Sequence, residues 1–182
     1  MPTKLNRKPN RLPIPGIYKS NNSFFVTVCV EGRVCCLCEI QNGKVDHGNF
    51  TYGKASLTPT GEIVRESWVS IANMINGIYI DDFVIMPNHF HGIITFLETP
   101  TFKNSGKILD LSQIIAIFKS KSTNLIRRGM PLASQNITNF QWQKSFYDHV
   151  IRDEKDLHRI QEYINNNPLN WELDSLNPGN NL

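Results

Sequence analysis

Residues 84–96 read Val-Ile-Met-Pro-Asn-His-Phe-His-Gly-Ile-Ile-Thr-Phe, a mostly apolar run rich in β-branched residues. Such residues favour strands, whereas the proline-asparagine pair inside the run favours a turn. The run therefore predicts an antiparallel hairpin, with one strand over 78–86 and the next over 89–97. This hairpin is the centre of the expected fold, because the other expected elements are arranged around it.

Two histidines stand at the start of the second strand of this hairpin. Side chains alternate between the two faces of a strand, so His89 and His91 share one face while Phe90 points towards a core on the other. The two imidazoles are then close enough to converge on one metal ion or one phosphate. Two histidines in an apolar strand indicate a chemical role, although a lone His-x-His pair is more often incidental.

Hydrophobic periodicity places the other elements around the hairpin, in the order strand, strand, helix, strand, strand, helix, strand, helix. This order predicts an α+β fold of the ferredoxin-like kind, an antiparallel sheet with helices packed on one face and a further helix at the C-terminus. The other face of the sheet would be free for a ligand. Besides the hairpin, the expected strands are 24–30, 34–40 and 146–151, and the expected helices are 60–75, capped by Thr60, then 111–128 and 153–167.

The length of 182 residues, with 40% hydrophobic and 19% charged residues, is typical of a single domain with its own core. We expect this domain over 17–172, between an extended basic arm at 1–16 and a loose tail at 173–182. No apolar run approaches the roughly 20 residues that span a bilayer, and no apolar segment follows the basic N-terminus. These features predict a soluble, cytoplasmic protein without a membrane partner.

The net charge of +3 permits an acidic partner such as nucleic acid but does not require one. Positive side chains gather in the second half of the chain at Lys119, Lys121, Arg127 and Arg128. This cluster is either a contact surface for phosphates or ordinary solvated surface.

All four cysteines lie between residues 29 and 38, in a stretch that we interpret as a β-hairpin. A structural zinc site needs four ligands, and no second pair accompanies the Cys-x-x-Cys of Cys35 and Cys38. His47 is the one other ligand nearby. Buried, reduced thiols are therefore the better interpretation.

The last helix holds a second candidate site. Tyr163 and Asn167 are four residues apart, so they lie on one face, one turn from each other. A tyrosine can act as a nucleophile when a nearby cation helps its phenol to ionise, and an amide oxygen is a reasonable ligand for a hard cation. Taken singly, Tyr163 could be a core aromatic and Asn167 an ordinary helix stop before Pro168. The hypothesis of one shared site depends on the joint appearance of Tyr163 and Asn167 with the two histidines.

In this combination the chain resembles the single-tyrosine transposases of the insertion-sequence-200-like family, which carry a His-hydrophobic-His (HUH) motif. The branch it resembles most is the REP-associated tyrosine transposases. The resemblance spans roughly residues 12–172. The matching segments, in the family order, are 84–94, Phe118-Lys119-Ser120, 142–152, Glu162-Tyr163-Ile164 and Asn167-Pro168.

The resemblance implies a metal-dependent enzyme that cuts and joins DNA strands. His89 and His91 would bind a divalent cation, Mg²⁺ or Mn²⁺, with Asn167 completing the metal site. Tyr163 would attack a DNA phosphate, forming a 5′-phosphotyrosine intermediate and leaving a 3′ hydroxyl; Tyr147 fits the nucleophile motif less well. The partners would be single-stranded or hairpin DNA and a second copy of the chain, in a homodimer. The candidate DNA-binding residues are Lys119, Lys121, Arg127, Arg128 and Arg152.

Two other functions remain open from the sequence. A non-catalytic module derived from a transposase could bind single-stranded nucleic acid on the sheet without any use of metal. A metal-dependent hydrolase could instead activate water in place of Tyr163.

Overall fold

A computed structural model describes residues 22–41, 54–129 and 140–180. Its centre is a four-stranded sheet in the order β4-β5-β1-β6, in which every neighbouring pair is antiparallel. The strands are β1 (Ser23–Cys29), β4 (Ile75–Ile85), β5 (His89–Phe102) and β6 (Tyr147–Ile151). The helices are α1 (Pro59–Val69), α2 (Ile71–Met74), α3 (Leu111–Gly129) and α4 (Glu154–Asn166), followed by the 3-10 helices η3 (Asn167–Leu173) and η4 (Pro178–Asn180).

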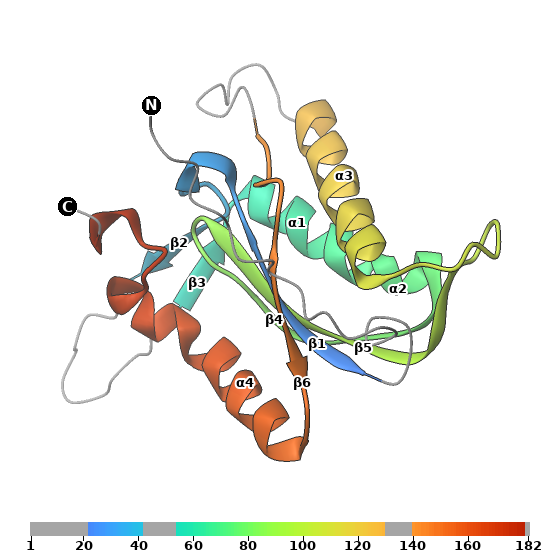
Figure 1. Ribbon diagram of the computed structural model, residues 1–182. Helices are drawn as coiled ribbons and strands as arrows, with labels where there is room; N and C mark the ends of the chain where they lie inside the picture. The colour runs from blue at the N-terminus through green and yellow to red at the C-terminus, as the bar shows by residue number, and fades with distance from the viewer. Residues whose placement is uncertain (1–21, 42–53, 130–139, 181–182) are drawn as a thin grey trace, which may run out of the picture.

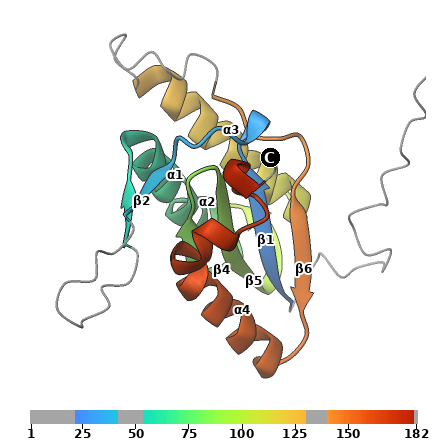
Figure 2. The ribbon, with the colours of Figure 1, turned by 90° about the vertical axis from the view of Figure 1, so that its left-hand side faces the viewer.

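The helices form layers on both faces of this sheet. Helices α1 and α3 lie on one face, and α4 lies on the other (Figure 1). Figure 2, turned by 90°, shows α4 in front of the strands and α3 behind them. The expected α+β fold, with an antiparallel sheet and a C-terminal helix, is confirmed, but the face expected to be free for a ligand is partly covered by α4 (Figure 1).

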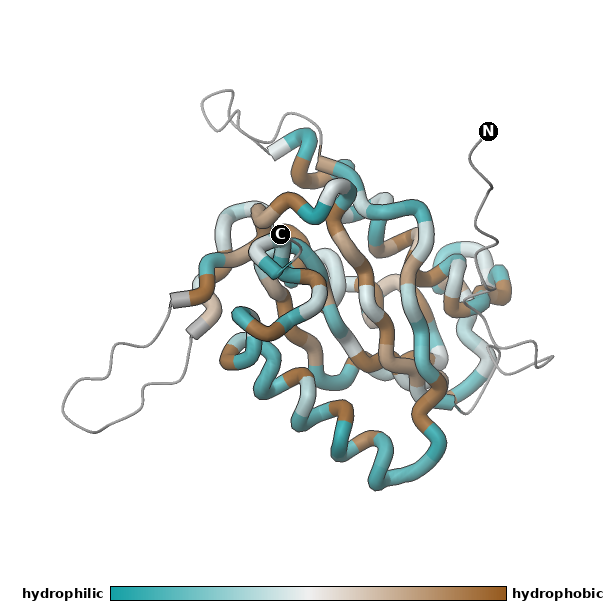
Figure 3. Tube along the Cα trace, turned by 60° about the vertical axis from the view of Figure 1, so that its left-hand side comes forward, coloured by the Kyte–Doolittle hydropathy of each residue, from teal (hydrophilic) through white to brown (hydrophobic). Residues whose placement is uncertain are grey.

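Two separate apolar cores follow from these layers. The larger one packs β1 and β5 against α1 and α3, and it buries Phe90 against Trp68 and Phe118, with ring centroids 4.7 and 5.2 Å apart. The smaller one holds α4 on the opposite face of the sheet through Ile160 and Ile164. Figure 3 shows strands that are largely hydrophobic, and beside them helix α4, in which hydrophobic and hydrophilic residues alternate along its length. Because α4 is anchored on this face, it borders the side chains that β1 and β5 project there.

The expected strand over 34–40 does not form a hairpin with β1. The 3-10 helix η1 (Glu31–Arg33) turns the chain away, with φ of 66° at Gly32 and 54° at Arg33. Only Cys38–Gln41 is a strand, β2, and it pairs with β3 (Lys54–Leu57) in a separate two-stranded sheet. The physical reason is that both edges of β1 are already occupied, by β5 and β6.

The cap of the first long helix differs from the expectation by two residues. Thr58, not Thr60, accepts the capping hydrogen bond, from the backbone N–H of Gly61 at 3.1 Å. Pro59 is well suited to the first helical position, which makes the residue before it the cap. Thr60 is buried in the first turn instead.

The cysteines are free thiols in different environments. Cys36 and Cys38 are buried, and burial raises the pKa of the first thiol to about 11 and of the second to about 12. Cys35 is exposed, contrary to the expectation of buried thiols, because it lies before β2 begins. His47 lies outside the described residues, as does the expected basic arm at 1–16. Within the described part of the chain, no helix is long and apolar enough to cross a membrane.

Candidate metal and nucleophile site

Strand register places the candidate residues in rows on the face of the sheet that α4 borders. His91 lies opposite Thr27, which lies opposite Tyr147 across the next strand. His89 lies opposite Cys29, one pleat further along. Side chains of such partners on neighbouring strands project to the same face, so β5, β1 and β6 together build the floor of a site.

The tautomer of His89 is fixed by its neighbour Asn88. The Nδ2 amide of Asn88 donates to the carbonyl oxygens of Arg33 and Leu176, at 3.2 and 2.8 Å, which fixes the orientation of the amide. Its Oδ1 must then accept from Nδ1–H of His89, at 2.8 Å. The lone pair of His89 is therefore on Nε2, a buried atom with no hydrogen-bond partner among the described residues.

His91 occupies the same face, with its ring centroid 4.5 Å from that of His89. Its Nδ1 lies 2.8 Å from the hydroxyl of Thr27, and its Nε2 lies 3.4 Å from the hydroxyl of Tyr163. Burial lowers the pKa of His89 to about 4 and also lowers the pKa of His91, further depressed by His89. Both imidazoles are consequently neutral at neutral pH, the form that binds a metal ion.

Tyr163 reaches the histidines from α4. Its side chain is 47% exposed, and its ring meets Phe25 edge-on at 5.9 Å between centroids. Burial raises the pKa of the phenol, while a hydrogen bond from the side chain of Asn167 opposes the rise. The phenol is accordingly protonated at neutral pH, and an incoming cation would favour its ionised form.

Two residues offer side-chain oxygen atoms as candidate ligands. Asn167 is buried at the end of α4, and its Oδ1 has no hydrogen-bond partner among the described residues. Oδ2 of Asp174 lies 3.7 Å from Nε2 of His89. His89, His91 and Asp174 each offer a ligand atom, and these atoms lie within 4.8 Å of one another. Two imidazole nitrogens with a carboxylate oxygen fit a divalent cation such as Mn²⁺ or Mg²⁺.

Three residues of this site were not predicted from the sequence: Thr27, Asn88 and Asp174. Asn88 stands in the opening stretch directly before His89, and Thr27 is a polar residue within an apolar strand, so both carried a local signal. Asp174 lies in the expected loose tail, yet the segment after η3 folds back onto the sheet, where Leu176 binds Asn88. No local pattern indicates that contact.

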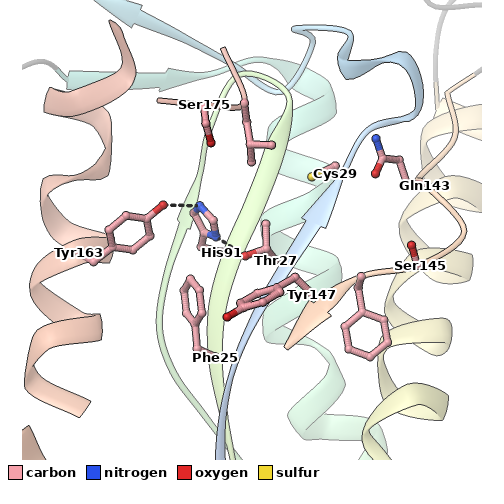
Figure 4. Close-up of a pocket in the computed structure, with 11 residues that line it drawn as sticks. Phe25, Thr27, Cys29, His91, Gln143, Ser145, Tyr147, Tyr163 and Ser175 are labelled. Atoms are coloured by element: carbon pink, nitrogen blue, oxygen red, sulfur yellow. Dashed lines mark hydrogen bonds between the residues drawn. The ribbon is translucent and has the colours of Figure 1, made fainter. Parts of the chain in front are cut away.

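A cleft of about 370 Å³ opens beside His91 and Tyr163. Figure 4 shows Tyr163 pointing at His91 from α4, with Phe25 and Tyr147 on one side of the histidine and Ser175, Cys29 and Gln143 on the other. The cleft therefore leads from solvent to the hydroxyl of Tyr163 and the imidazole of His91.

The five candidate DNA-binding residues do not line this cleft. Lys119 and Arg127 border a separate shallow groove of about 360 Å³ on α3. The ammonium group of Lys119 donates to the carbonyl oxygens of Gln143, Lys144 and Ser145, at 2.8, 3.4 and 2.9 Å. An ammonium has three donors, so these contacts leave none for a phosphate. The remaining candidates are Lys121 and Arg128 on α3, and the exposed Arg152 just after β6.

Comparison with known proteins agrees with this architecture. Residues 58–167 match the family described as Transposase IS200 like. An uncharacterized protein of Haemophilus influenzae is 31% identical over 172 residues, which cover 87% of each chain. The chain therefore belongs to the IS200-like transposase family.

Among the solved structures that share the fold is a REP-associated tyrosine transposase bound to a REP hairpin, with a TM-score of 0.51 and 21% identity, covering 91% of this chain and 72% of that one. This likeness concerns the fold.

Proposed function

We propose that this protein cuts and rejoins single-stranded DNA through a covalent bond between Tyr163 and a 5′ phosphate. The observation that carries the proposal is the 3.4 Å separation between the hydroxyl of Tyr163 and Nε2 of His91, in a chain of the IS200-like transposase family. A nucleophile is brought next to two neutral, same-face imidazoles by elements far apart in the sequence. This is the geometry that metal-assisted attack on a phosphate requires.

Each residue of the site has a part in this reaction. His89 and His91 would hold a divalent cation together with Asp174, and Asn167 would offer a further oxygen ligand. When bound, the cation supplies electrostatic stabilisation of the charge that develops on the phosphate. Asn88 and Thr27 orient the imidazoles through Nδ1, as partners of metal-binding histidines generally do.

The chemical step is a displacement at phosphorus. The phenolic oxygen of Tyr163 forms a bond to phosphorus as the bond from phosphorus to the 3′ oxygen breaks. The phenol gives up its proton, and the leaving 3′ oxygen takes one up to become a hydroxyl. The reverse attack by a 3′ hydroxyl rejoins the strand without ATP, since the phosphotyrosine bond conserves the energy of the broken bond.

The DNA partner is single-stranded, with hairpins as the first substrates to test. A hairpin is the ligand in the related solved structure, and the cleft beside Tyr163 is open to solvent. Tyr163 and His91 meet within one chain, so a single copy holds the whole candidate site. Dimerisation stays a prediction, which light scattering of the protein with and without DNA tests.

The proposal is tested by incubating the protein with a library of hairpin oligonucleotides and Mn²⁺ or Mg²⁺, then resolving products under denaturing conditions. We expect a protein–DNA adduct that resists denaturation, appears only with metal and is lost with EDTA. Binding without cleavage across the library would instead favour a non-catalytic DNA-binding protein. Cleavage without any adduct would favour a hydrolase that activates water.

A further inference from the structure

A groove continues from the candidate site along the sheet, away from the metal-ligating residues. A second cleft, of about 290 Å³, lies between β6 and α4 and is bordered by His149 and Arg159. Phe25, Tyr147 and Tyr163 line both this cleft and the one beside His91. The two clefts therefore form one groove that passes the nucleophile and ends at Arg159.

Tyr147 stands in the middle of this groove. It lies two strands from His91 in the same row, with Thr27 between them, so it is about 10 Å from the histidine backbone. Tyr147 is 54% exposed and lines both clefts. Figure 4 shows its ring beside Phe25, on the face of the sheet that holds His91. An exposed aromatic ring at such a position offers a stacking surface for a base.

The far end of the groove carries the guanidinium group of Arg159, ion-paired with Asp156. The carboxylate of Asp156 accepts from Nη2 of Arg159 at 2.6 Å and lies 2.8 Å from Nε2 of His149. These contacts hold the pKa of Asp156 down to about 2, so its charge persists and keeps Arg159 oriented. The Arg159 side chain is 71% exposed, and its guanidinium group has further donors that can reach a phosphate.

We infer that the groove between β6 and α4 binds the nucleotides adjoining the scissile phosphate, with a base stacked on Tyr147 and a phosphate on Arg159. This inference rests on the proposed function for the identity of the strand, but it concerns binding and does not require cleavage. It assigns to Tyr147 a positioning role instead of a nucleophilic one. Stacking accepts any base, so this part of the groove holds single strands without reading their sequence.

The test measures binding of a fluorescein-labelled oligothymidylate of about 20 nucleotides by anisotropy, using the full-length protein without metal. We expect Tyr147→Ala to weaken binding about tenfold, and Tyr147→Phe, which keeps the ring, to bind within about twofold of wild type. Tyr79→Ala is the matched control, because Tyr79 is also 54% exposed but lies on β4, at the opposite edge of the sheet from β6, and lines neither cleft; it should change nothing. Arg159→Gln should reduce the slope of log affinity against log salt by about 0.7, the loss of one phosphate contact.

An oligonucleotide of the same length with abasic residues isolates the stacking. Wild type and Tyr147→Ala should bind it equally, and equal thermal melting of the variants verifies their fold. The inference is overturned if Tyr147→Ala binds oligothymidylate like wild type, if its defect persists on the abasic strand, or if wild type binds neither. A Tyr147 effect without any covalent adduct on hairpins would contradict the proposed function alone.

Discussion

The hydroxyl of Tyr163 lies 3.4 Å from Nε2 of His91, and the two residues are 72 positions apart in the same chain. Helix α4 holds the tyrosine and β5 holds the histidine, and the small core of Ile160 and Ile164 keeps the helix on that face. A rigid helix on a rigid strand is a more accurate way to place a nucleophile than a loop would be. The candidate site therefore depends on α4 and β5 keeping their positions relative to each other.

Asn88 should control metal affinity without being a ligand. Asn88→Ala removes the acceptor for Nδ1–H of His89, so Nε2 is no longer fixed as the ligand atom. We expect Mn²⁺ to bind about 10- to 100-fold more weakly, measured by electron paramagnetic resonance or calorimetry. Asn88→Asp keeps the acceptor and should retain more of the affinity than Asn88→Ala. Equal Mn²⁺ affinity in wild type and Asn88→Ala would exclude the orienting role.

The two proposed oxygen ligands, Asp174 and Asn167, should contribute differently to Mn²⁺ affinity. Asp174→Asn removes a negative charge 3.7 Å from Nε2 of His89 while keeping the shape, so Mn²⁺ affinity should fall about tenfold or more. Asn167→Ala removes a neutral ligand and should cost less. If Asp174→Asn binds Mn²⁺ as wild type does and Asn167→Ala does not, Asn167 alone completes the site.

The stability of the metal-free protein should fall as the pH is lowered from 7 to 5. Burial lowers the pKa of His89 from 6.5 to about 4, so below pH 6.5 the unfolded chain binds a proton that the folded chain does not. Stability is then lost progressively with falling pH, by about 1.4 kcal/mol per unit for one such group. His91 acts in the same direction. Urea unfolding at several pH values measures the effect.

His89→Gln provides the control for this pH dependence, because it keeps a polar side chain but cannot titrate. Its free energy of unfolding should decline less steeply between pH 6.5 and 5 than that of wild type. Parallel curves for the two proteins would mean that His89 is not buried in its neutral form.

Lys119 should support the wall of the cleft instead of contacting DNA directly. Burial lowers the pKa of its ammonium group to about 8, and three backbone carbonyls of residues 143–145 surround it. Lys119→Met leaves these carbonyls without their donor, so unfolding should become easier by about 2–4 kcal/mol. Lys121→Met, on the same helix, removes the same charge and should change stability by less than about 1 kcal/mol. Similar unfolding midpoints for the two variants would contradict the structural role.

The parts of the fold that follow local rules could be predicted from sequence. The hairpin at 84–96, the alternation that separates Phe90 from the histidines, and the amphipathic helix that carries Tyr163 each depend on neighbouring residues. The pairing of residues 34–40 could not be predicted in this way. It depends on which strands occupy the edges of β1, and those strands come from distant parts of the chain.

The candidate site likewise contains some residues that local sequence patterns predict and others that they do not. The histidines and Tyr163 were found because their spacing and type carry the signal. Asp174 was missed because its contact with His89 arises from the path of the chain after η3, which no periodicity describes. Lys119 looked like any surface lysine on a helix, and only the position of residues 143–145 reveals its contacts.

The most direct test of the central claim is to identify the residue that carries the DNA. The covalent adduct formed on a hairpin oligonucleotide with Mn²⁺ is digested with protease and nuclease, and the modified peptide is sequenced by mass spectrometry. The account predicts a nucleotide on Tyr163 in wild type and no adduct in Tyr163→Phe. An adduct on Tyr147, or an undiminished adduct in Tyr163→Phe, would contradict it.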